Sequence, residues 1–224
     1  MELPAIFVFT HDAMGDGEDG PTHQPVEQLI SWRAVPGMVV IRPGDANEVV
    51  EAYRVILQLK HKPAILVLSR QPLPTLDRVR YAPAAGLARG AYVVADASGG
   101  SPELILIGTG SELSLVVDAH ETLIKLGIRS RVVSMPSWDL FEEQLDPYKE
   151  SVLPTAIRAR VACEAAGGFG WDRYIGPQGR FVGMKSYGAS APASDLYKQF
   201  GITPEAVANA ARASIETVQA SSKK

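Results

Sequence analysis

The 224-residue sequence has a single cysteine, Cys163, so no disulfide can form within the chain. It has no excess of one charge either, because 22 lysines and arginines are set against 25 acids, for a net charge of −3. Such a balance gives none of the basic surface that binds nucleic acid or an anionic membrane. No apolar run approaches the length of a membrane-spanning helix, and no basic-then-apolar leader opens the sequence. Unless a targeting segment precedes these residues, we expect a cytoplasmic protein with no nucleic-acid and no membrane partner.

Short apolar runs alternate with amphipathic segments along the chain, and this alternation predicts an α/β layer architecture. Asp45 and Thr203 each stand where a helix N-cap is expected. Helices are expected over residues 25–32, 46–59, 109–126 and 203–218. Strands are expected over residues 5–9, 38–42, 64–68, 91–95, 104–108, 131–135 and 160–164, with a weaker one over 181–183.

Residues 72–88 are rich in proline and show little periodicity, so we expect a linker there. The domain boundary is expected near residues 86–89, which gives one unit over 1–86 and a second over 87–224. The first unit offers only about three strands and two helices. Its first strand, residues 5–9, reads as buried but has nothing before it in the chain. A domain that begins there exposes a sheet edge and apolar surface.

The stretch His11–Pro25, HDAMGDGEDGPTHQP, is the part of the sequence richest in chemistry. It combines two histidines, four acids and three glycines directly after an apolar strand. Glycine lets the backbone adopt positive φ and approach a ligand closely. Loops of this kind at the carboxyl end of a strand are where α/β proteins keep their sites.

Two side chains of this loop suit a sugar. The imidazole of His11 can donate to or accept from a hydroxyl or carbonyl near neutral pH. The alternative is a histidine that only caps the strand end. The carboxylate of Asp19 can accept hydrogen bonds from hydroxyls and discriminate stereochemistry, because a misplaced hydroxyl leaves it unpaired. The alternative is an aspartate that folds its own turn, an interpretation that fits Asp12 and Asp16 better.

Two further candidates are His23 and Arg70. His23 stands just before the helix expected over 25–32, where it could be structural. Arg70 follows the strand expected over 64–68, and a guanidinium at a strand end suits bidentate phosphate binding. The alternative for Arg70 is a salt bridge to an acid of the first loop, and the two states could alternate with and without ligand.

Other patterns carry less. The histidines and acids of residues 11–23 fit neither an EF-hand loop nor a helical His-x-x-x-His pair, so no metal ligand is predicted. The GTGSE turn, Gly108–Glu112, could cradle a phosphate, but an ordinary strand-to-helix turn is favoured. Cys163 is expected as a packed core thiol. His61 and His120 are expected to be solvated.

The loop resembles a motif of the transketolase family, THD-x-x-G-x-GEDGPTHQP, here residues 10–25. Collinear similarity continues through LSRQPLP (residues 68–74), GAYVVAD, ILIGTGSELSL, RVVSMPSWDLFEEQ and SYGASAPASDLYKQFGITPEAV. The resemblance implies a truncated pyrimidine-type thiamine-diphosphate-binding α/β unit over 1–86. A Rossmann-like transketolase C-terminal domain follows over 87–224. In that family the loop lies late in the chain, so this sequence resembles the C-terminal third.

The resemblance also implies an activity, namely transfer of a two-carbon ketol unit between phosphorylated sugars by a transferase of carbohydrate metabolism. The pathways implied are the pentose phosphate pathway and the Calvin cycle. Thiamine diphosphate and a divalent cation, Mg or Ca, serve the parent enzyme, which is expected to be a homodimer. The metal and diphosphate region and the cofactor-activating glutamate come before this loop in the family. This chain alone is therefore expected to bind neither cofactor and to be inactive.

By the same resemblance, four residues form the substrate side of the cleft. His11 contacts the donor sugar near its reacting carbons, Asp19 reads a hydroxyl, and Arg70 binds the sugar phosphate. His23 lies near both substrate and cofactor. Two alternatives stay open: a related enzyme such as deoxyxylulose-phosphate synthase or dihydroxyacetone synthase, and a noncatalytic assembly module.

Overall fold

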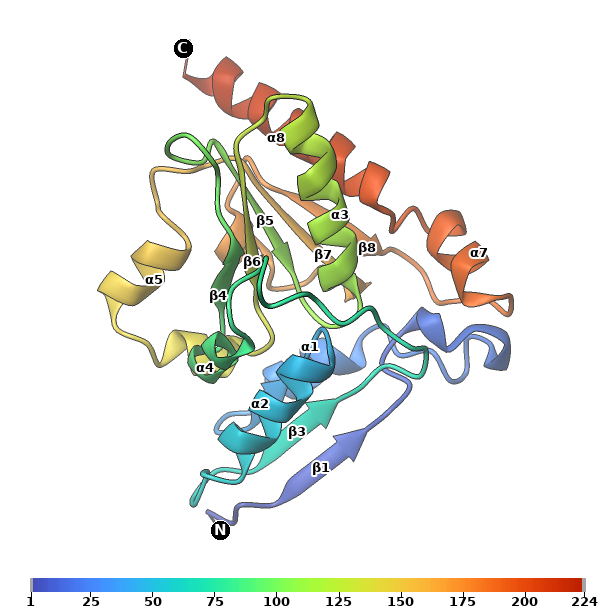
Figure 1. Cartoon of the computed structure of the whole chain (residues 1–224). Helices are drawn as coiled ribbons and strands as arrows, with labels where there is room; N and C mark the ends of the chain where they lie inside the picture. The colour runs from blue at the N-terminus through green and yellow to red at the C-terminus, as the bar shows by residue number, and fades with distance from the viewer. Residues whose placement is uncertain (1, 223–224) are drawn as a thin grey trace.

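The computed structural model describes residues 2–222, which form two separate sheets with helices around them (Figure 1). The first sheet has the strand order β1-β3-β2, and its strands are parallel. It is built from β1 (Ile6–Phe9), β2 (Val39–Ile41) and β3 (Ala64–Val67), with α1 (Gln28–Arg33) and α2 (Ala46–Ile56) between them. Asp45 caps α2 as predicted, because its side chain accepts a hydrogen bond from the Glu48 amide.

The burial predicted for the first strand is wrong. The four residues of β1 are between 41% and 47% exposed, although the strand itself lies where it was predicted. The reason is its position, because β1 pairs only with β3 and forms an edge of the sheet. An apolar edge strand of this kind presents unpaired backbone groups and side chains to any chain that can cover them. Among the described residues, one aromatic ring stacks on this strand, that of Trp32 on Phe9.

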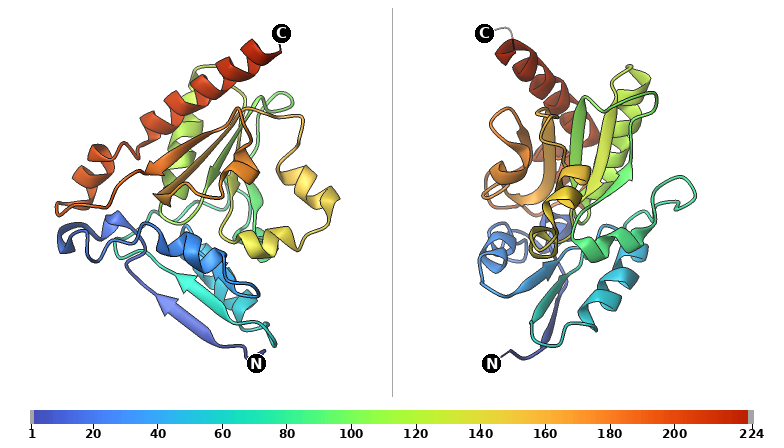
Figure 2. Two further views of the ribbon diagram at one scale, coloured as in Figure 1. Left: turned by 180° about the vertical axis from the view of Figure 1, so that it is seen from behind. Right: turned by 90° about the vertical axis from the view of Figure 1, so that its left-hand side faces the viewer.

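The second sheet has the order β4-β6-β5-β7-β8, with β4 antiparallel to β6 and the remaining pairs parallel. Alternate residues of β5 face opposite sides, as the pleat requires. Leu104 and Leu106 pack toward α3 and α8, whereas Ile105 and Ile107 pack toward α4, α5 and α6. Both faces of this sheet are therefore covered (Figure 2). Its strands are β4 (Tyr92–Ala95), β5 (Leu104–Gly108), β6 (Ser130–Ser134), β7 (Arg160–Gly167) and β8 (Arg180–Met184). Its helices are α3 (Glu112–Lys125), α4 (Trp138–Glu142), α5 (Asp146–Val152), α6 (Asp172–Ile175), α7 (Ala193–Gln199) and α8 (Pro204–Ser221).

All eight predicted strands are present, but α4 to α7 were not predicted. These four helices have four to seven residues each, too few to show a 3.6-residue repeat. A short 3-10 helix, η2 (Ala84–Arg89), overlaps the end of the segment predicted as a linker. The two sheets lie on either side of residues 86–87, and the boundary itself stays a prediction. Among the described residues there is no helix long and apolar enough to span a bilayer.

The predicted surroundings of Cys163 and His120 can be compared with the structure. Cys163 is buried in β7 as predicted, and burial raises the pKa of its thiol well above the ordinary value. His120 was predicted to be solvated, but it is buried, and its Nδ1 lies 2.7 Å from the hydroxyl oxygen of Ser130. The prediction was wrong because α3 packs that face of the helix against the start of β6.

Candidate functional site

The candidate site begins where β1 ends, at the carboxyl edge of the first sheet. His11 has φ +64°, a left-handed conformation that few non-glycine residues adopt. Such backbone strain is common at functional sites. The chain then forms a 3-10 helix, η1 (Met14–Asp19), which is broken by Gly17 with φ +80°. These two turns fold the acids of the loop back toward His11.

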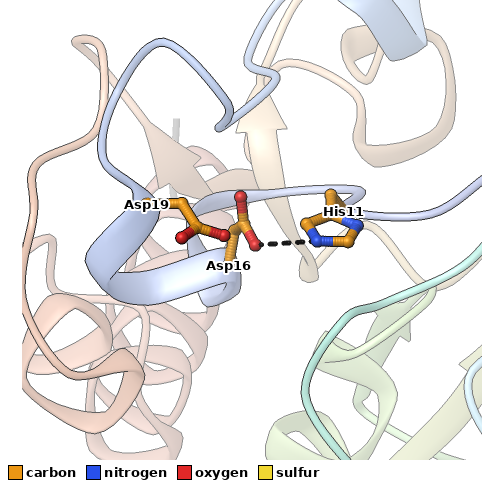
Figure 3. Close-up of side chains that lie close together, drawn as sticks. All are labelled: His11, Asp16 and Asp19. Carbon is orange, nitrogen blue, oxygen red and sulfur yellow. Dashed lines mark ion pairs between the residues drawn. The ribbon is translucent and has the colours of Figure 1, made fainter.

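His11, Asp16, Asp19 and Arg70 converge on one point. Nε2 of His11 lies 3.4 Å from Oδ1 of Asp16 (Figure 3). Nε of Arg70 lies 3.4 Å from the same oxygen and 3.8 Å from Oδ2 of Asp19. The side chains of His11, Asp19 and Arg70 are 42%, 47% and 50% exposed, so a ligand can reach all three.

Asp16 is the centre of this cluster and the member that the sequence did not single out. Its side chain is fully covered, yet neither carboxylate oxygen has a hydrogen-bond partner. Burial raises the pKa of Asp16, and the nearby Asp19 acts in the same direction, while His11 and Arg70 oppose the shift. The turn-forming role predicted for this residue is wrong, because its carboxylate faces His11 and Arg70 rather than its own backbone.

The cluster offers three ligand atoms, one each from His11, Asp16 and Asp19, within 4.8 Å of one another. A cation there would also meet the guanidinium of Arg70, which already faces both carboxylates. A mixed set of acids, an imidazole and an arginine suits a ligand that carries hydroxyls and an anionic group. The alternative interpretation of Arg70, an ion pair with the first loop, is the arrangement found here.

His23 lies in a neighbouring pocket of about 400 Å³, which it shares with His11. Thr22 Oγ1 lies 3.0 Å from Nδ1 of His23. Phe9 and Trp32 stack in one wall with ring centroids 4.7 Å apart. A flat heteroaromatic ring fits such a wall, whereas the lining residues include no lysine or arginine for a diphosphate. These residues thus fit the ring part of thiamine diphosphate and not its diphosphate part.

A second group of charged side chains is joined to the loop through Asp12. We call Asp12, Arg33, Arg42, Glu112 and Glu164 the buried ion network, since each side chain is at most 2% exposed. Arg42, which follows β2, donates from Nε to Asp12 Oδ2 at 2.8 Å and from Nη1 to Glu112 Oε2 at 2.6 Å. Arg33 of α1 makes a bidentate pair with Glu164 of β7 at 2.7 and 2.8 Å.

The network corrects the interpretation of Asp12, which does not fold its own turn but pairs with Arg42. Burial raises the pKa of Asp12, although Arg42 opposes the shift. For Glu164 burial acts in the same sense, but Arg33 and Arg42 outweigh it and lower the pKa. The GTGSE turn is an ordinary strand-to-helix turn in this structure, because the amides of Gly110 and Glu112 already donate to the carbonyls of Arg42 and Thr109. The Arg42 guanidinium fills the space beside the turn, since a Cβ on Gly110 would stand 2.4 Å from its central carbon.

Three of the four predicted site residues therefore come together around Asp16, and the fourth joins His11 at the pocket. Sequence reasoning missed Asp16 and the buried ion network. The only sequence signal for them was the excess of acids in the loop. The local sequence does not indicate which of these acids pairs with which arginine.

The fold and the site define a two-sheet α/β protein with a polar loop at the carboxyl edge of its first sheet. Two family models match: "Transketolase, pyrimidine binding domain" over residues 1–75 and "Transketolase-like TK C-terminal domain" over residues 90–203. A transketolase of Halalkalibacterium halodurans is 51% identical over 216 residues, which are 96% of this chain and 32% of that protein. The chain belongs to the transketolase family.

Two solved structures bear out the fold. Transketolase from Pichia stipitis in complex with sedoheptulose 7-phosphate has a TM-score of 0.90 and 38% identity, covering 98% of this chain and 31% of that one. A structure titled as a split gene transketolase, an inactive β4 tetramer, has a TM-score of 0.76 and 20% identity. It covers 95% of this chain and 67% of that one, and shows the fold alone. The chain spans about a third of the curated relative it matches.

Proposed function

We propose that this chain forms the sugar-binding C-terminal third of a ketol-transferring transketolase. The observation that carries the proposal is the convergence of His11, Asp19 and Arg70 on one buried carboxylate at the end of β1. That set pairs a hydroxyl acceptor with a phosphate-binding cation, which is what a phosphorylated sugar requires. The Pichia stipitis relative, solved in complex with sedoheptulose 7-phosphate, supports the substrate class.

Each residue then has a distinct task. The guanidinium of Arg70 leaves the two carboxylates and takes the phosphate, in a charge-assisted contact stronger than a neutral hydrogen bond. Asp19 accepts from a sugar hydroxyl and is left unpaired by the wrong epimer. His11, which is half exposed at the pocket mouth, donates to or accepts from the oxygens near the reacting carbons.

The cofactor is proposed to be shared with the rest of the enzyme. His23 and the wall formed by Phe9 and Trp32 would hold the ring end of thiamine diphosphate. When bound, that cofactor supplies carbanion chemistry, while the protein orients and selects the sugars. Its diphosphate and divalent cation, Mg or Ca, would be held by the two-thirds of the family's length that this chain does not span. A cytoplasmic location also stays a proposal.

The edge of β1 is the proposed attachment surface for that remaining two-thirds. Its exposed apolar side chains and unpaired backbone edge favour association with another chain or segment. The same surface favours the second candidate function, a noncatalytic assembly module. Dimerisation of the parent enzyme is proposed on the same ground.

Complementation separates the two candidates. The 224-residue chain alone is expected to give no ketol transfer from xylulose 5-phosphate. Adding a separately expressed N-terminal portion of a close relative is expected to restore turnover, measured by coupled assay. A complex that forms on size exclusion yet stays inactive with thiamine diphosphate and Mg²⁺ supports the assembly module instead. Turnover by the chain alone contradicts both.

In the complemented enzyme, Arg70→Ala is expected to raise KM for phosphorylated sugars about ten- to a hundredfold. A lost charge-assisted phosphate contact costs about 1.5–3 kcal/mol. Hydroxypyruvate carries no phosphate, so its KM is expected to stay near the parent value. The matched variant Arg70→Lys keeps the charge and is expected to lie between the two. Equal losses on both kinds of substrate would show that Arg70 supports the loop and not the ligand.

A further inference from the structure

The segment that leads into α7 makes hydrogen bonds to the loop that carries His11. Ser190 Oγ donates to the Glu18 carbonyl at 2.6 Å. Gln24 Nε2 donates to both the Gly17 carbonyl, at 2.8 Å, and the Ala189 carbonyl, at 2.9 Å. The contact of α7 with η1 is visible from behind, where the orange segment meets the blue loop (Figure 2). The second sheet's layer therefore covers the loop directly.

The loop is also held by the buried ion network, through Asp12. Arg42 presents Nε and Nη2 to one oxygen of Asp12, at 2.8 and 2.7 Å. Its Nη1 lies 2.6 Å from Glu112 Oε2. Arg42 is itself fixed at its backbone, since its amide donates to the Pro136 carbonyl and its carbonyl accepts from the Gly110 amide. Asp12 is therefore held by an arginine whose own backbone is fixed by two hydrogen bonds.

Glu112 is the anchor of this connection. Its Oε2 also accepts from the Ala165 amide at 2.8 Å, and its Oε1 accepts from the hydroxyls of Ser111 and Tyr197 at 2.7 and 2.8 Å. Four donors thus fix one fully buried carboxylate at the first turn of α3, where the helix dipole favours a negative charge. The three donors other than Arg42 all belong to residues beyond position 110.

Asp12 is the residue next to His11, and His11 is the loop residue with a positive φ. A carboxylate pinned at residue 12 fixes the peptide between them and so the direction of the imidazole. We propose that Glu112, acting through Arg42 and Asp12, is a positioning residue for His11. The second sheet's layer then sets the geometry of the sugar site, and only the link to turnover rests on the proposed function of His11.

The test follows the ring signals of His11 by NMR in the full 224-residue chain. The chain has four histidines, so His11→Gln assigns the signal directly. Glu112→Ala removes the anchor and is expected to shift and broaden the His11 ring signals. Glu112→Gln is expected to restore them, because its carbonyl can face Arg42 and Ala165 while its NH₂ faces two hydroxyls that can accept.

Glu48→Ala is the matched control. Glu48 is also fully buried and also joins the two layers, through Tyr92 at 2.7 Å and Ser134 at 2.6 Å, but it does not touch the loop. Glu48→Ala is expected to lower the denaturation midpoint about as much as Glu112→Ala does, and to leave the His11 ring signals unchanged. If Glu112→Ala does not fold, Glu112→Asp is used instead. It keeps the negative charge, but its shorter side chain cannot reach Arg42, and the same His11 ring signals are measured.

The proposal is overturned if the Glu112 variant loses stability while the positions and widths of the His11 ring signals stay at wild type. It is also overturned if Glu48→Ala disturbs His11 equally. In the complemented enzyme, Glu112→Ala is expected to lower kcat/KM up to about a hundredfold, as a misplaced group does. If His11→Ala leaves turnover unchanged, the proposed role of His11 fails, whereas the positioning measured by NMR stands.

Discussion

Arg42→Met is expected to lower the free energy of unfolding by about 3–5 kcal/mol. The methionine fills much of the arginine's volume but leaves Asp12 and Glu112 buried without their cation, and removing one partner of a buried ion pair has an effect of this size. Domains of this size have about 5–15 kcal/mol in total, so the variant is expected to be close to unfolding at 37 °C. Urea denaturation followed by circular dichroism measures the difference.

Arg54→Met is the control for that experiment. Arg54 pairs with Glu51 at 2.7 Å on the surface of α2, and its side chain is 68% exposed. An exposed pair contributes little to stability because water screens it and the side chains lose freedom in making it. An equal loss in the two variants would mean that the buried ion network does not hold the layers together.

Trp171→Ala is expected to cost a similar amount, about 3–5 kcal/mol, the range for deleting a buried aromatic side chain. Trp171 is fully buried under the second sheet, in edge contact with Trp138 at 5.0 Å between ring centroids. Its Nε1 also donates to Glu164 Oε2 at 2.8 Å, so the variant removes one support of the Arg33–Glu164 pair. Thermal denaturation followed by circular dichroism measures the loss.

Trp171→Phe separates the two contributions. Phenylalanine keeps most of the apolar contact with Trp138 but cannot donate to Glu164. We expect it to recover more than half of the lost stability. A phenylalanine variant as unstable as the alanine variant would assign the effect to the hydrogen bond rather than to packing.

The strands were predictable because a buried parallel strand needs a continuous apolar run, and such runs stand out between polar segments. The caps at Asp45 and Thr203 were predictable for a similar reason, since capping depends on a residue and its third neighbour. The short helices α4 to α7 were not. Each buries one to three aromatic or aliphatic side chains whose partners lie far along the chain, as Trp138 does with Trp171.

The sequence by itself determined the α/β class, and it predicted a candidate site on the loop after β1 with residue types that suit a phosphorylated sugar. All three follow from local patterns: apolar runs, glycines in a polar loop, and a motif of fixed spacing. Only the tertiary structure decided that Asp16 stands between His11 and Arg70, that β1 is an exposed edge, and that Asp12 is joined to Glu112 through Arg42. The ion pairs that Arg42 and Arg70 make there join residues 30 to 70 positions apart, and electrostatic contact depends on distance in space, which no local pattern encodes.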